Sequence, residues 1–79
     1  MENFITTDLV LATVLSYFGE NLSDTNKNEK GEIEFIFSKT TDLEQLVKSF
    51  ALDELTVSPR RFSIVLKDMK KILYTQKIN

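Results

Sequence analysis

The chain has 79 residues, of which 42% are hydrophobic, and a net charge of −2 at pH 7. This length allows one domain, and no apolar run approaches the roughly 20 residues that a membrane span needs. The chain has no cysteine and no histidine. Disulfides and thiolate metal sites are therefore excluded, and so is the commonest catalytic base. We expect a single domain over residues 1–79 that is not an enzyme and holds no cofactor or metal.

The first predicted elements are a short strand or extended entry over residues 3–7 and a helix over 9–18. Either Thr6 or Thr7 would cap this helix, because a hydroxyl at that position can bond the free N–H groups of the first turn. Nearly every position of the helix is apolar, which is typical of a helix that is buried on more than one side. We expect it to be the central element, ending at Gly19.

A polar stretch and an alternating stretch follow. Residues 20–31 are polar and close on a glycine, which predicts a flexible surface loop. Residues 32–38 alternate between apolar and polar side chains, which predicts a half-buried strand. Its buried face would carry Ile33, Phe35 and Phe37.

The second half of the chain predicts two helices. Thr41 and Glu44 form a capping box, and the apolar spacing after them predicts an amphipathic helix. Residues 55–57 predict a brief strand. Ser58 followed by Pro59 is typical of a helix start, and this last helix should end near Tyr74, with residues 75–79 frayed. We therefore expect an α+β fold in the order (β)α–loop–β–α–(β)–α, with three helices packed on a small sheet of two or three strands.

Charge is distributed unevenly along the chain. Residues 1–57 carry a net charge of −7 and residues 58–79 a net charge of +5. On a helical wheel, Arg60, Lys67 and Lys71 line up opposite the apolar stripe of the last helix. The other residues of interest on this helix are Arg61 in its first turn, Lys70 and Tyr74 beside the basic line, and Ile64 within it.

Two interpretations of this basic helix stay open. It can be a surface for phosphates or for an acidic partner, because arginines and free N–H groups at a helix start attract anions. Alternatively, Arg60 and Arg61 pair with nearby carboxylates, and the lysines only keep the helix in solution. The carboxylates within reach in the sequence are Asp42, Asp53 and Glu54.

The motifs of catalysis and metal binding are incomplete in this sequence. Asp24–Asn28 resembles the start of a calcium loop, but Glu29 and Phe35 replace the glycine and the glutamate that such a loop requires. Glu32 and Glu34 lie on one strand face, where solvated carboxylates are ordinary. The two glycines, Gly19 and Gly31, cannot form a phosphate-binding loop. We find no sign of a small-molecule substrate.

Binding is therefore the predicted role. We expect protein–protein contacts, regulatory or host-directed, such as blocking a host defence, with a host protein or a second copy of the chain as partner. A homodimer would also enlarge a small hydrophobic core. The alternative is a nucleic-acid-binding accessory protein that uses the basic face of the last helix, although the acidic overall charge counts against it.

Several segments resemble a family of short uncharacterised proteins of phages and bacterial genomes, described only as a domain of unknown function. They are Thr6–Ala12, Ile33–Phe37 and Val57–Phe62, together with Lys67, Lys70 and the pair Leu73–Tyr74. The resemblance implies a cytoplasmic protein of phage or prophage type, in the host cytoplasm if phage-encoded. The absence of cysteine fits a reducing compartment, and the acidic start Met1–Asn3 does not resemble a signal peptide.

Overall fold

The computed structural model describes residues 2–78, with side chains over residues 2–76. It is an α+β fold with a three-stranded antiparallel sheet and three helices, which confirms the predicted class. In chain order the elements are β1 (Asn3–Thr6), α1 (Leu9–Tyr17), β2 (Leu22–Lys27), β3 (Ile33–Ser38), α2 (Thr41–Ala51) and α3 (Pro59–Ile78).

β3 is the middle strand of the sheet, with β1 on one side and β2 on the other. The pairing places Phe37 opposite both Phe4 of β1 and Leu22 of β2. The register with β2 shifts between Leu22 and Asp24, so Ser23 is the extra residue of a bulge. Both outer strands are short, and the sheet depends on β3 to hold them together.

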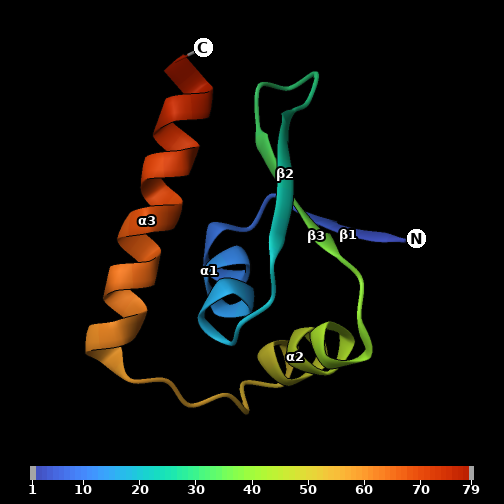
Figure 1. Ribbon diagram of the computed structural model, residues 1–79, viewed down its shortest axis with the longest axis vertical. Coiled ribbons are helices and arrows are strands. Elements are labelled where there is room, and N and C mark those ends of the chain that lie inside the picture. Colours follow the sequence, from blue (N-terminus) through green and yellow to red (C-terminus); the bar gives the residue numbers. More distant parts are fainter. Residues whose placement is uncertain (1, 79) are drawn as a thin grey trace.

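Apolar side chains at every second position of β3 form the sheet side of the hydrophobic core. Ile33, Phe35 and Phe37 are 2%, 0% and 0% exposed, as predicted. They pack against α1, whose residues Leu11–Leu15 are all buried. Figure 1 shows α1 between α3 and the sheet, and α1 contacts α2, α3 and β1. The prediction of a central first helix is therefore confirmed.

The prediction of a polar loop over residues 20–31 is wrong for its central part, because residues 22–27 form β2. Only Leu22 and Thr25 of this strand are partly buried. The strand is held by main-chain pairing with β3 rather than by an apolar face, and composition does not reveal such pairing. The turn from β2 to β3 contains Gly31, whose φ of +81° suits glycine.

Both predicted helix caps are displaced by one or two residues. Asp8 caps α1 by accepting hydrogen bonds from the N–H groups of Val10 (2.9 Å) and Leu11 (3.1 Å). A carboxylate also suits the positive end of the helix dipole. The prediction that Thr6 or Thr7 caps α1 is therefore wrong, because Asp8 occupies the cap position. Thr40, rather than Thr41, caps α2.

Two predictions about the last third of the chain are also corrected. Residues 55–57 form no strand, since no partner strand lies beside them in the described sheet. α3 does not end near Tyr74 but continues to Ile78, so residues 75–78 are helical, while Asn79 lies outside the described residues. None of the described helices has the length and the apolar composition that a membrane-spanning helix requires.

Candidate binding surface

The sequence around Ser58 and Pro59 starts α3 as predicted. Pro59 is the first helical residue, and the Phe62 N–H donates to the Ser58 carbonyl at 2.8 Å. Proline is favoured there because its fixed φ suits a helix and its missing N–H is not needed. Met69, only 3% exposed, anchors the apolar stripe of the helix in the core. The Ser16 hydroxyl of α1 donates to the Met69 sulfur at 3.6 Å.

The opposite side of α3 faces solvent. Arg60, Lys67 and Lys71 are all exposed, and at 100° per residue they fall within an arc of about 40°. Ile64 and Tyr74 flank this arc, each about 20° beyond one of its edges, and they are 55% and 59% exposed. We call these five residues the outer face of α3. It combines cations with two exposed large apolar side chains.

The structure separates the other two predicted site residues from this face. Lys70 is exposed and flanks the outer face. Arg61 is turned about 100° from Arg60 and reaches α1. Its guanidinium lies 5.8 Å from the centre of the Tyr17 ring, and its Nη2 donates to the Tyr17 hydroxyl at 3.5 Å. The sequence predicts that Arg60 and Arg61 form one anion site, but Arg60 lies on the outer face of α3 while Arg61 lies against Tyr17 of α1.

The ion pairs of the described side chains lie elsewhere. Lys39 is 3.2 Å from Glu2 and 3.6 Å from Glu44. The hydrogen bond with Glu2, followed by the negative charges of Glu2 and Glu44, raises the pKa of Lys39 above 10.5.

Over residues 2–76, Arg60 and Arg61 form no ion pair with Asp42, Asp53 or Glu54, so the predicted internal pairing is not present. The described cations of the outer face also have no carboxylate within 4.0 Å over the same residues.

Tyr17 organises the start of α3. Its hydroxyl accepts a hydrogen bond from the Ser58 N–H at 2.9 Å. Its ring contacts Phe18 edge-on at 5.0 Å and Phe62 at 5.9 Å between ring centres. The residue therefore joins the end of α1 to the first turn of α3, and it positions Arg61.

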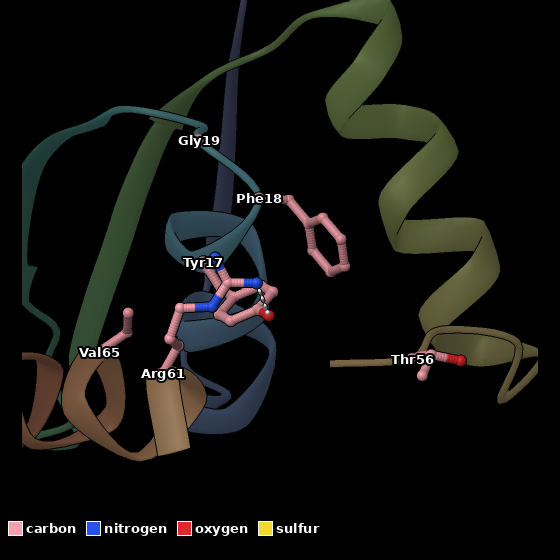
Figure 2. Close-up of a pocket in the computed structure, with 6 residues that line it drawn as sticks. All are labelled: Tyr17, Phe18, Gly19, Thr56, Arg61 and Val65. Carbon is pink, nitrogen blue, oxygen red and sulfur yellow. Dashed lines mark hydrogen bonds between the residues drawn. The ribbon is translucent and has the colours of Figure 1, made fainter. Parts of the chain in front are cut away.

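A pocket opens beside this contact, and Figure 2 shows the Arg61 side chain lying over Tyr17 with Phe18 and Thr56 to one side. We call it the Arg61 pocket. Its volume is about 640 Å³. Its lining residues are Tyr17, Phe18, Gly19, Thr56, Arg61 and Val65.

Sequence reasoning missed Tyr17, Phe18 and Thr56 as site residues. Tyr17 and Phe18 were assigned to the apolar surface of α1, and Thr56 to a strand. A helical wheel of α3 could have separated Arg61 from Arg60, but only the fold shows that α1 ends beside Arg61.

The described residues hold no group of three or more acidic side chains that could bind a metal ion. Phe35 and Phe37, which could have stacked bases on an exposed sheet, are fully buried. The outer face of α3 and the Arg61 pocket are the two surfaces that combine unpaired cations with exposed large apolar or aromatic side chains among the described residues.

Comparisons with known proteins place the chain in a family. Searches of curated proteins and of solved structures found no match. Residues 1–75 match the family model described as "Domain of unknown function (DUF5659)". The match includes α1, the whole sheet, α2 and most of α3. The chain therefore belongs to the DUF5659 family.

Proposed function

We propose that the chain is a non-enzymatic protein-binding module that holds an acidic segment of another protein against the outer face of α3. The observation that carries this proposal is the composition of that face. Arg60, Lys67 and Lys71 have no carboxylate within 4.0 Å over residues 2–76, and they are flanked by Ile64 and Tyr74, which are 55% and 59% exposed.

The apolar residues favour a protein over a nucleic acid. Nucleic-acid interfaces are strongly basic and polar, and their affinity comes mainly from phosphate contacts. Here Ile64 and Tyr74 lie on either side of the three cations, where a protein partner can bury them.

The charges indicate the chemistry of the partner. Exposed cations attract and orient an acidic surface, while buried apolar side chains supply most of the affinity. Arg60 and Lys71 are 11 residues apart, which is about 16 Å along a helix at 1.5 Å per residue. An acidic amphipathic segment of about three helical turns matches this length.

We propose that this binding takes place in the cytoplasm, or in the host cytoplasm if the chain is phage-encoded, and that its role is regulatory or host-directed. The absence of cysteine supports a reducing compartment. Membership of the DUF5659 family supports no particular partner, because that family has no described function.

Selection of peptides from a displayed random library on the wild-type chain tests the proposal. We expect selected peptides to combine Asp or Glu with apolar residues at helical spacing. The double variant Lys67→Glu/Lys71→Glu should bind them at least about tenfold more weakly, because opposite charges become like charges. The matched control Lys27→Glu/Lys30→Glu makes the same change in net charge on the β2–β3 hairpin, and it should change affinity by no more than about twofold.

Three outcomes would contradict the proposal. Equal loss of binding in both double variants would show that net charge alone matters. Salt-sensitive binding of DNA or RNA that only Lys67→Glu/Lys71→Glu abolishes, with no peptide selected, would assign the face to nucleic acid. Sedimentation that detects a dimer which the same variant dissociates would assign the face to a second copy.

A further inference from the structure

We propose that the Arg61 pocket is a second, separate binding site, and that it takes a carboxylate carried on an aromatic or branched apolar group. The site does not depend on the outer face of α3, because Arg61 points to α1 and not outward with Arg60. Its occupant is defined by three features of the pocket: a free guanidinium, an apolar wall and a phenol hydroxyl.

The guanidinium of Arg61 is held in place but is not neutralised. It lies over the Tyr17 ring at 5.8 Å, and one of its nitrogens donates to the Tyr17 hydroxyl at 3.5 Å. Over residues 2–76, no carboxylate lies within 4.0 Å of it. Arginine presents parallel N–H groups that match the two oxygens of a carboxylate. Because the stack on Tyr17 already restricts the side chain, less conformational entropy is lost when a carboxylate binds.

Part of the pocket wall is apolar, and the pocket is open to solvent. Phe18 is 39% exposed, although it is large and hydrophobic, and its ring stands beside Tyr17 and Arg61 (Figure 2). Val65 adds an aliphatic surface from α3. Gly19 has no side chain, and even an added Cβ would meet nothing within 4 Å, so this part of the pocket is open. An aromatic ring or a branched aliphatic group fits this combination.

The Tyr17 hydroxyl is a further group that can orient a bound carboxylate. It accepts hydrogen bonds from the Ser58 N–H and from Arg61. A phenol also has one proton of its own to donate, so the hydroxyl can donate to a ligand oxygen beside the guanidinium. The volume of about 640 Å³ lies within the range of ligand pockets, about 300–1,000 Å³.

Two sources share this chemistry, namely a free aromatic acid and the C-terminal carboxylate of a peptide. Three probes separate them: 3-phenylpropanoate, N-acetyl-phenylalanine, and the uncharged N-acetyl-phenylalaninamide. In a titration followed by amide NMR shifts, the acids should perturb Gly19, Thr56 and Arg61 with a Kd of about 1 mM. Equal affinity for the two acids would support a free acid, and tighter binding of N-acetyl-phenylalanine would support a chain terminus. The amide should bind at least about fivefold more weakly, because it cannot form the charged pair.

Variants at Arg61 decide whether the guanidinium carries the binding. Arg61→Gln should raise the Kd of the acids about tenfold, and Arg61→Lys should raise it less, because the charge remains without the planar fork. Lys48→Gln removes the same charge on α2 and should leave the Kd unchanged. Arg61 is exposed, and dispersed spectra of both variants would confirm that they fold.

The proposal is overturned if the acids perturb none of the lining residues. It is equally overturned if the uncharged amide binds as well as the acids, or if Arg61→Gln and Arg61→Lys retain wild-type affinity. These results would leave the outer face of α3 unaffected, since the peptide selection does not involve the three probes.

Discussion

Tyr17 joins the end of α1 to the start of α3. Its hydroxyl holds the Ser58 N–H at 2.9 Å, one residue before the helix begins. The variant Tyr17→Phe keeps the ring contacts and removes this bond. We predict a loss of about 1 kcal/mol in the free energy of unfolding, because a part-buried N–H loses its partner. Urea denaturation measures the loss.

The matched control at this scale is Tyr74→Phe. Tyr74 is 59% exposed on the outer face of α3, so removal of its hydroxyl should change the free energy of unfolding by less than about 0.5 kcal/mol. Equal stability of the two variants would mean that the Tyr17 hydroxyl does not hold the start of α3.

The predictability of the candidate site differs from residue to residue. Arg60, Lys67 and Lys71 could be grouped from spacing alone, because a helix repeats every 3.6 residues and their positions follow that period. Arg61 was misassigned because its neighbour in space, Tyr17, lies 44 residues away in sequence. Periodicity describes one helix and carries no information on which other helix its side chains meet.

At the scale of the elements, β3 has one face in the core and one toward solvent. Ile33 is 2% exposed on the core face, while Ile36 is only partly buried on the other face. We predict that Ile33→Ala lowers the free energy of unfolding by about 2–4 kcal/mol, because it leaves a cavity.

The same substitution at Ile36 should cost less than about 1.5 kcal/mol, because solvent already reaches that side chain. Urea denaturation measures the free energy of unfolding of both variants, which differ only in the face of β3 that carries the substituted isoleucine. Similar losses would mean that a further element or a second copy covers the solvent side of the sheet.

Sequence patterns predicted the elements that bury an apolar face and missed the one that does not. β3 and α2 have clear periods, and both are confirmed. β2 reads Leu-Ser-Asp-Thr-Asn-Lys, and its strand character comes from pairing with β3, which is a property of the fold. The two adjacent threonines at 40 and 41 made the start of α2 ambiguous, because either hydroxyl could cap it. Only the backbone geometry identifies Thr40.

In the molecule as a whole, the most basic segment of the chain is also a peripheral helix. The molecule is flat, with extents of 35 × 32 × 19 Å, and α3 runs along one side of it with α1 between it and the sheet (Figure 1). The segment 58–79 carries a net charge of +5 against −7 for the rest of the chain. The basic helix is therefore at the periphery, where a partner can approach it along its length.

The most direct test of the outer face of α3 is an amide NMR map of the chain titrated with a selected acidic peptide. We expect the largest shift changes at Ile64, Lys67 and Lys71, and we expect them to shrink as salt is added, because exposed charges are screened. Shift changes centred on the exposed Ile5 and its partly buried strand partner Ile36 would contradict this expectation, and so would shift changes that added salt does not reduce.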